Sequence, residues 1–102
     1  MSDEVLSDAM DAVLLWGPER MIPEIDRLRE KHPGESDSDL QAALLEAHRV
    51  LSEAEGLAGG IKTGEIHDAH RRISEGRPWL SDEQVGRAIQ QGLYFHWRDT
   101  GL

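Results

Sequence analysis

The sequence predicts an all-α fold, a small four- to five-helix domain with a bundle-like or orthogonal arrangement. Apolar residues recur at helical spacing in five segments of the chain, and no segment has the pattern of a β-strand. Glycine and proline separate most of these segments, as expected for helices joined by turns. Because 102 residues is the length of one domain, we expect a single helical domain over residues 1–102.

The first helix is expected to begin after Ser2, which can cap its N-terminus. It should end where Gly17 and Pro18 follow each other, since neither residue favours continuing a helix. Leu14 and Leu15 fall outside its apolar stripe, so the end of this helix should be covered on more than one face. The stripe consists of Val5, Ala9, Ala12 and Trp16, with Leu6 and Val13 beside it.

The second helix is expected over about 23–32. Pro23 suits the first helical position, where its missing N–H leaves no hydrogen bond unmade. Acidic residues lie near the positive N-terminal end of the helix dipole, and basic residues lie near the negative C-terminal end. Pro33 and Gly34 then end the helix. Its apolar edge comprises Ile22, Ile25 and Leu28.

The third helix has the most regular apolar stripe in the chain. Its start has two candidates, Ser38 with Gln41 in a capping-box pattern or Ser36 with Asp39. Leu45 projects away from the stripe, where it would suit contact with a partner. The small residues of the stripe would allow another helix to approach closely. The stripe contains Leu40, Ala43, Leu44, Ala47, Val50, Leu51 and Ala54.

A glycine-rich segment, from Gly56 to Gly64, is expected to be a flexible connection after the third helix. The fourth helix is expected over roughly 64–75, and Gly76 and Pro78 should end it. Its apolar side comprises Ile66, Ala69, His70 and Ile73.

The fifth helix has the clearest start. Ser81 and Gln84 form a capping-box pattern, and Leu80 and Val85 occupy the two hydrophobic-staple positions. Gly92 lies on the inward face, where glycine costs about 1 kcal/mol relative to alanine, so it indicates a close-packed neighbour. We expect the third and fifth helices to form the central packing pair. The inward face contains Val85, Ala88, Ile89, Leu93 and His96.

The chain is acidic, with 20 Asp and Glu against 11 Lys and Arg and a net charge of −9. Residues 1–56 hold 14 acidic and 5 basic side chains (net −9), and residues 57–102 hold 6 of each (net 0). A negative field repels phosphate backbones and anionic lipids, so neither nucleic acid nor a membrane is expected as a partner. The carboxylates are expected to be solvated helix faces. The alternative is an acidic face that mimics DNA, as in an acidic inhibitor of a nucleic-acid enzyme.

The sequence lacks the residues and motifs that several kinds of chemistry require. The chain contains no cysteine, which excludes a thiolate nucleophile, a zinc ribbon and an iron–sulfur cluster. Ile61 separates Gly60 from Lys62, unlike the contiguous residues of a phosphate-binding loop. Neither a signal-peptide pattern nor an apolar run of ~18 residues is present. We therefore expect a cytoplasmic protein without enzymatic activity or a cofactor.

A metal-binding helical protein is one alternative. His67 and His70 lie three residues apart on the expected fourth helix, so their imidazoles could share one ion. The motif His-Glu-x-x-His needs four-residue spacing and a glutamate, whereas this pair has three-residue spacing and Asp68. Ordinary helix histidines, with His70 partly buried, are the simpler interpretation.

A helix-turn-helix-like DNA-binding regulator is a second alternative, with helices about 64–75 and 82–97. Arg71, Arg72 and Arg77 supply local positive charge. The connection between the two helices is longer than the usual three- to four-residue turn, and Asp82 and Glu83 would face phosphates. The arginines are expected to pair with carboxylates instead.

Four of the five aromatic residues lie in the last 24 positions. They cannot all follow one narrow stripe, so the final helix either closes the core with them or exposes some as anchors. Tryptophan, tyrosine and arginine are enriched at binding hot spots. The sequence therefore predicts a small non-enzymatic interaction or regulatory protein that self-associates or binds a protein partner, aided by attraction between its acidic and near-neutral halves. The expected anchors are Trp79, Tyr94, Phe95 and Trp97, with Leu45 as a secondary one.

Overall fold

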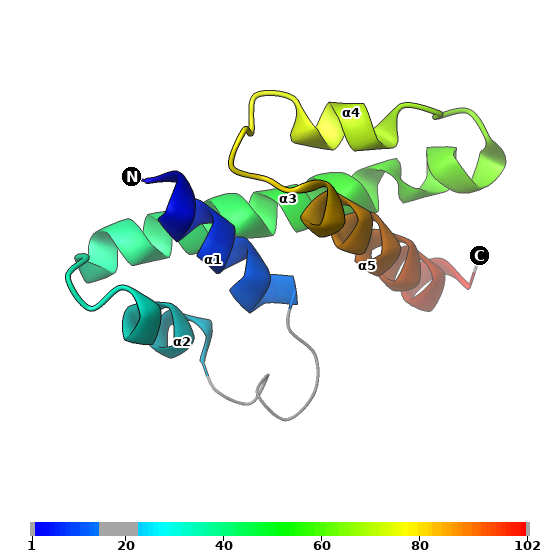
Figure 1. Ribbon diagram of the computed structural model, residues 1–102. Coiled ribbons are helices and arrows are strands. Elements are labelled where there is room, and N and C mark those ends of the chain that lie inside the picture. The colour runs from blue at the N-terminus through cyan, green and yellow to red at the C-terminus, as the bar shows by residue number, and fades with distance from the viewer. Residues whose placement is uncertain (1, 15–22, 102) are drawn as a thin grey trace. The chain divides into compact units, whose positions relative to one another are not determined.

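The computed structural model describes residues 2–14 and 23–101, which form five helices and no strand (Figure 1). The all-α prediction is confirmed. The helices are α1 (Asp3–Leu14), α2 (Glu24–Lys31), α3 (Asp37–Thr63), α4 (Ala69–Ser74) and α5 (Asp82–Thr100). No helix in the described part of the chain is both long and apolar enough to cross a membrane.

The chain divides into two compact units, residues 1–48 and residues 49–102. The boundary falls inside α3, whose N-terminal part belongs to the first unit and whose C-terminal part belongs to the second. The expectation of one domain over the whole chain stays a prediction, and each unit is described by itself.

In the first unit α1 packs against α2. Ser2 caps α1 as expected, because its Oγ accepts a hydrogen bond from the Val5 N–H at 3.2 Å. The predicted stripe is buried at its described positions, and Leu14 is buried as well, so more than one face of α1 is covered. Trp16, Leu15 and the predicted stop at Gly17 and Pro18 lie outside the described residues. The buried α1 residues are Val5, Ala9, Met10, Ala12, Val13 and Leu14.

The starts of α2 and α3 refine the predictions. Pro23 is the N-cap of α2 and not its first helical residue, because its ψ of 138° is extended. At α3 the Ser36 Oγ accepts from the Asp39 N–H at 3.2 Å, so the second of the two candidate starts is the observed one. The α3 stripe is buried from Leu40 to Ala54 except Leu51, which is half-buried, and Leu45 is 56% exposed.

The prediction of a flexible connection from Gly56 to Gly64 is wrong, because α3 continues to Thr63. Tertiary packing offsets the weak helix propensity of the glycines here. Ala58 is fully buried in this segment. A Cβ on Gly60 would overlap the Ile66 side chain, so glycine at this position leaves room for the segment that follows α3. The helix ends only at Gly64, whose φ of 81° is left-handed.

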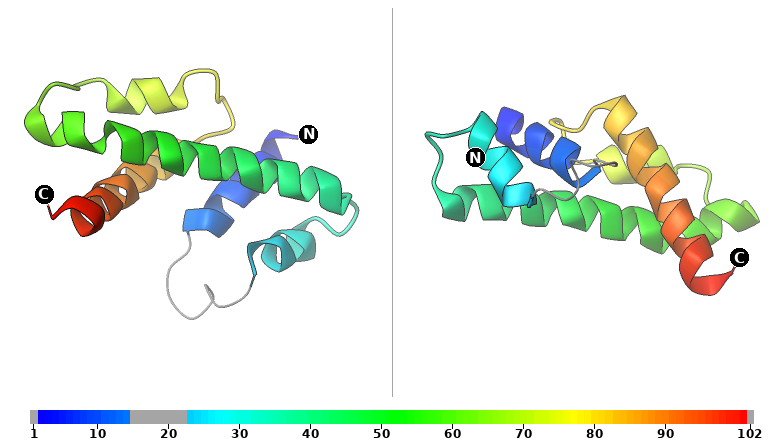
Figure 2. Two further views of the ribbon diagram at one scale, coloured as in Figure 1. Left: turned by 180° about the vertical axis from the view of Figure 1, so that it is seen from behind. Right: turned by 90° about the horizontal axis from the view of Figure 1, so that it is seen from below.

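In the second unit α4 packs against α5, and α5 crosses the C-terminal part of α3 (Figures 1 and 2). The direct packing of α3 on α5 depends on Gly92. A Cβ at Gly92 would lie 2.8 Å from the Ala54 carbonyl carbon and 2.9 Å from its oxygen. The α3 and α5 backbones are therefore in contact, as the glycine on the inward face predicted. The capping box of α5 is also confirmed, with Ser81 and Gln84 exchanging hydrogen bonds of 3.1 and 3.0 Å.

Candidate protein-interaction surface

The side of α5 that meets α3 determines which aromatic residues remain exposed. At 100° per residue, Tyr94 and Trp97 lie about 200° and about 140° around the helix from Gly92. Because Gly92 faces α3, both aromatic residues point to the opposite side. Tyr94 is 46% exposed and Trp97 is 55% exposed.

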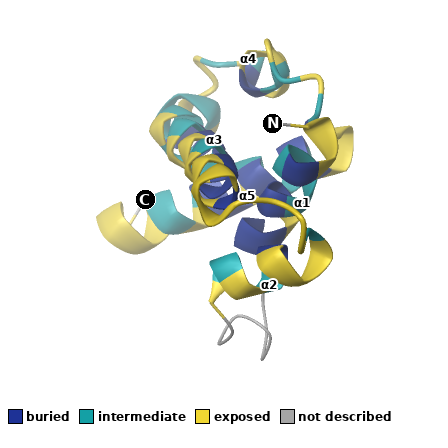
Figure 3. Cartoon of the chain, turned by 90° about the vertical axis from the view of Figure 1, so that its left-hand side faces the viewer, coloured by how far each residue is buried: buried dark blue, intermediate teal, exposed yellow. Residues whose placement is uncertain are grey.

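Three aromatic side chains gather on the last turns of α5, and we call Tyr94, Phe95 and Trp97 the aromatic face. The Tyr94 ring lies 5.7 Å from Phe95 in an edge-on arrangement and 6.2 Å from Trp97 in a tilted one. Such distances are typical of stabilising aromatic pairs. Phe95 is half-buried, and Figure 3 shows the C-terminal end of α5 as mostly exposed. The aromatic face is therefore one connected cluster, with Phe95 half-buried and Tyr94 and Trp97 exposed.

Charge on the aromatic face is locally balanced. The Arg98 guanidinium carbon lies 4.8 Å from the centre of the Phe95 ring, within cation–π range. The Arg98 Nε also donates to Asp99 at 3.2 Å. Arg98 was not among the predicted site residues, although its three-residue spacing from Phe95 on a helix indicates such a contact.

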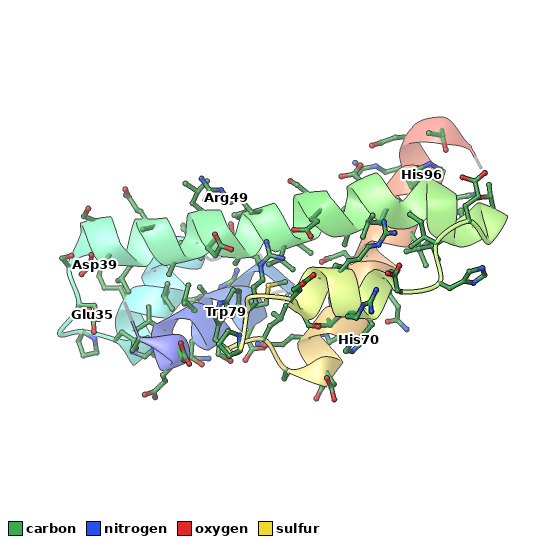
Figure 4. All side chains as sticks on the ribbon, turned by 90° about the horizontal axis from the view of Figure 1, so that it is seen from above. Glu35, Asp39, Arg49, His70, Trp79 and His96 are labelled. Carbon is green, nitrogen blue, oxygen red and sulfur yellow. The ribbon has the colours of Figure 1, made fainter. Side chains whose placement is uncertain are left out.

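The end of α5 is fixed by local contacts. Gly101 adopts the left-handed conformation with φ 75°, and its N–H donates to the Trp97 carbonyl at 2.7 Å. His96 lies beside the C-terminal part of α3 (Figure 4), where the Lys62 Nζ is 3.4 Å from its Nδ1. These contacts hold the turn that carries the aromatic face in a defined orientation.

The aromatic face contains three of the five predicted anchors. Trp79 lies in the connection between α4 and α5 and is half-buried, next to the buried Leu80. Leu45 belongs to the first unit, whereas Tyr94 and Trp97 belong to the second. Leu45, Tyr94 and Trp97 are the exposed large hydrophobic side chains of the described residues.

The metal-site alternative depends on the prediction that His67 and His70 lie on one helix, and this prediction is wrong. His67 lies in the segment before α4, which begins at Ala69 and not near residue 64. Asp68 is the N-cap residue of α4, and its carboxylate contacts the side chains of Arg71 and Arg72 in the first turn. The His70 side chain is half exposed on α4 (Figure 4) and lies 3.6 Å from the Asp82 Oδ1. No group of three potential metal ligands occurs among residues 2–14 and 23–101.

The three arginines of the predicted helix-turn-helix contact carboxylates, as expected. Arg71 and Arg72 each lie 2.8 Å from the Asp68 carboxylate, and the hydrogen bond from Arg71 is the main reason that the pKa of Asp68 is lowered. Arg77 donates to the Ile73 carbonyl at 2.8 Å and lies 2.9 Å from the Glu53 carboxylate. The connection that would be the turn of a helix-turn-helix is thus tied to α3.

Carboxylates of the acidic first unit also have internal partners. The Asp8 Oδ2 lies 2.7 Å from the His32 Nε2, and the Glu24 Oε1 lies 3.0 Å from the His48 Nε2. Arg29 lies 2.7 Å from Asp26 and 3.1 Å from Asp37. The two histidine–carboxylate links were not predicted, because residues 24 apart in the sequence become neighbours only when the helices are placed.

Comparisons with known proteins found no match: no family model matches the chain, and neither a curated protein nor a solved structure matches it.

Proposed function

We propose that this chain is a small non-enzymatic regulatory or interaction protein of the cytoplasm that self-associates through the aromatic face of α5. The observation that carries the proposal is the exposure of Tyr94 and Trp97 side by side on one helix. Both residue types are frequent anchors at the centres of protein interfaces.

The exposed aromatic area is large enough to matter energetically. An aromatic side chain presents about 150–250 Å², so Tyr94 and Trp97 together expose roughly 200 Å². At about 25 cal/mol per Å², covering this area would contribute up to about 5 kcal/mol before the entropy of association is subtracted. This supports a reversible contact.

The charge of the second unit permits such a contact. Residues 49–102 hold 8 acidic and 7 basic side chains, a net charge of −1, whereas residues 1–48 hold 12 and 4, a net charge of −8. Two copies that meet through the second unit therefore bring together nearly neutral surfaces, although each whole chain carries −9.

Light scattering at one fixed concentration, chosen between roughly 1 µM and 1 mM so that the wild type is associated, tests the proposal on the wild type and on single alanine variants. We expect Tyr94→Ala and Trp97→Ala each to weaken association by about 2 kcal/mol and lower the average mass toward that of a monomer. Leu45→Ala should have a smaller effect, because Leu45 is exposed without a comparable cluster. Ser52→Ala, an exposed position on α3, is the control and should leave the mass unchanged. An oligomeric mass unaffected by Tyr94→Ala and Trp97→Ala would refute the assignment.

A further inference from the structure

We propose that Ser74 is a phosphorylation site for a serine kinase that selects arginine, and that its phosphate group competes with Glu53 for the guanidinium of Arg77. Ser74 is the last residue of α4, and Arg71 and Arg72 lie three and two positions before it. Phosphorylation at this position does not depend on self-association, since α4 carries no residue of the aromatic face.

The residues around Ser74 have the charge pattern that such a kinase reads. Residues 69–77 hold three arginines and one glutamate, a net charge of +2 within a chain of net charge −9. Kinases that select this pattern line their substrate groove with carboxylates, which bind arginine through charge-assisted hydrogen bonds. The side chains of Arg71 and Arg72 are 79% and 50% exposed, and both contact Asp68. Such exposed ion pairs are weak, so both guanidinium groups can exchange Asp68 for carboxylates of a kinase.

Ser74 can be presented to a kinase because α4 is short. The Ser74 side chain is half-buried, and its hydroxyl donates to the Arg71 carbonyl at 3.2 Å. A kinase binds the segment around its target serine in an extended conformation, so the last turn of α4 must open. This helix has six residues, of which Ala69 and Ile73 are buried, and a helix of this length depends on tertiary contacts. Opening its last turn therefore costs little compared with opening the middle of a long helix.

Ser52 on α3 provides a comparison within the same unit. It is exposed, and Arg49 lies three positions before it. Val50, however, lies two positions before it, where Ser74 has a second arginine. Ser52 also lies inside a helix of 27 residues, which cannot open locally as easily as α4. We therefore expect the kinase to modify Ser74 and not Ser52.

The reaction transfers the γ-phosphoryl group of ATP to the Ser74 Oγ. The bond between phosphorus and this oxygen forms as the bond to the β-phosphate oxygen breaks, ADP leaves, and a carboxylate of the kinase accepts the hydroxyl proton. The product carries a charge of about −1.5 to −2 near pH 7 and has three strong acceptor oxygens. It can no longer donate a hydrogen bond to the Arg71 carbonyl.

The phosphate group would form next to Arg77. The Arg77 backbone N–H donates to the Ser74 carbonyl at 3.0 Å, and its Nη1 donates to the Ile73 carbonyl at 2.8 Å, so its side chain folds back over the end of α4. The Arg77 Nη2 lies 2.9 Å from the Glu53 Oε2 on α3. A phosphate of nearly two charges attracts a guanidinium more strongly than a carboxylate of one charge does. The modification is therefore expected to weaken the link between Arg77 and Glu53.

Incubation of the intact chain with ATP and the catalytic subunit of cyclic-AMP-dependent protein kinase, which selects arginine at both positions, tests the assignment. Mass spectrometry counts the phosphate groups and locates them. We expect one phosphate group, at Ser74, and none in Ser74→Ala. Replacing Arg71 and Arg72 together by alanine should slow the reaction about 10-fold or more. Asp68→Asn is the matched control, because it removes the same ion pairs from α4 but keeps both arginines, and it should not slow the reaction.

Two results would overturn the assignment. One is an intact chain that takes up no phosphate, or that takes it up at Ser52 and not at Ser74. The other is a rate that the loss of Arg71 and Arg72 leaves unchanged, since the kinase would then not be reading the arginines.

Urea denaturation of the unmodified and the phosphorylated chain tests the competition for Arg77. Glu53→Gln should lower the unfolding midpoint of the unmodified chain, and it should lower that of the phosphorylated chain by less, because the link to Arg77 is already weakened. Glu55→Gln, two residues further along α3, is the control and should change both forms equally. Equal losses for Glu53→Gln in the two forms would show that the phosphate does not compete for Arg77 and would overturn this part of the proposal.

Discussion

Each unit is stabilised by contacts within it, and the two units differ in the kind of contact. In residues 1–48, polar side chains link helices across long stretches of sequence, with Asp8 bound to His32 and Glu24 to His48. In residues 49–102, the α3 and α5 backbones touch at Ala54 and Gly92, and Arg77 ties the connection before α5 to Glu53. The net charges of the two segments are −8 and −1.

This difference accounts for which large side chains of α5 are exposed. In the first unit, the carboxylates of Asp8 and Glu24 connect helices through histidine side chains. In the second unit, small residues fill the contact between α3 and α5, so the large aromatic side chains of α5 are left for the opposite side. The near-neutral unit therefore exposes Tyr94 and Trp97, whereas the first unit exposes Leu45.

Gly92→Ala is expected to have the largest effect on folding. Its Cβ would meet backbone atoms of Ala54 and Glu55 at 2.8 Å, and backbone cannot move aside as a side chain can. We expect the free energy of unfolding to fall by about 2 kcal/mol, after allowing for the better helix propensity of alanine. Urea denaturation followed by circular dichroism measures this change.

Gly86→Ala is the matched control on the same helix. A Cβ at Gly86 would have nothing within 4 Å, so this variant should gain up to about 1 kcal/mol from helix propensity. If the two substitutions changed stability in the same direction, the backbone contact between α3 and α5 would not be the feature that holds the second unit together.

The helix caps provide the next comparison. Ser81→Ala removes the reciprocal capping box of α5 and should lower the free energy of unfolding by about 1 kcal/mol. Ser36→Ala removes a single hydrogen bond at the start of α3 and should cost less. Thermal unfolding of both variants ranks them, and a larger loss of stability for Ser36→Ala would mean that the reciprocal capping box of α5 does not contribute more than a single capping hydrogen bond.

The cross-helix pairs of the first unit should differ according to burial. The His32 and Asp8 side chains are 12% and 25% exposed, whereas those of His48 and Glu24 are 50% and 34% exposed. Double-mutant cycles with alanine at each pair should give coupling free energies of about 1 kcal/mol for the first pair and about 0.3 kcal/mol for the second. Equal couplings would mean that burial does not govern these links.

The smallest expected effect concerns pH. Arg71 lowers the pKa of Asp68 from its ordinary value of 3.8, so ionised Asp68 stabilises the folded state. Because the folded-state pKa is the lower one, this stabilisation is present above pH 3.8 and disappears as the pH falls through the lowered pKa. The stability difference between wild type and Asp68→Asn should follow the same course in denaturation at several pH values. A difference that grew on acidification would have the wrong sign.

Sequence patterns predicted those features of the fold that depend on residues close together in the sequence. The capping box at Ser81, the close contact at Gly92 and the exposure of Leu45 follow from residue type and helical spacing. The extension of α3 through Gly56 could not be predicted, because the burial of Ala58 overrides the helix-breaking tendency of glycine.

For the candidate site as well, some features could be predicted from the sequence and others could not. The outward direction of Tyr94 could be derived from its spacing to Val85, and the structure agrees. Which aromatic residues cluster could not be derived, since Trp79 lies in a connection whose path depends on the contact of Arg77 with Glu53. The histidine–carboxylate pairs of the first unit likewise depend on the arrangement of its helices.

Sedimentation velocity over a concentration series from roughly 1 µM to 1 mM tests the self-association claim most directly, since a small interface should dissociate within this range. The wild type should rise from the monomer mass of 11.4 kDa toward twice that value, while Trp97→Ala should remain near the monomer mass at concentrations where the wild type is dimeric. A wild type that stays at 11.4 kDa throughout, or a Trp97→Ala variant that rises in step with it, would contradict the account.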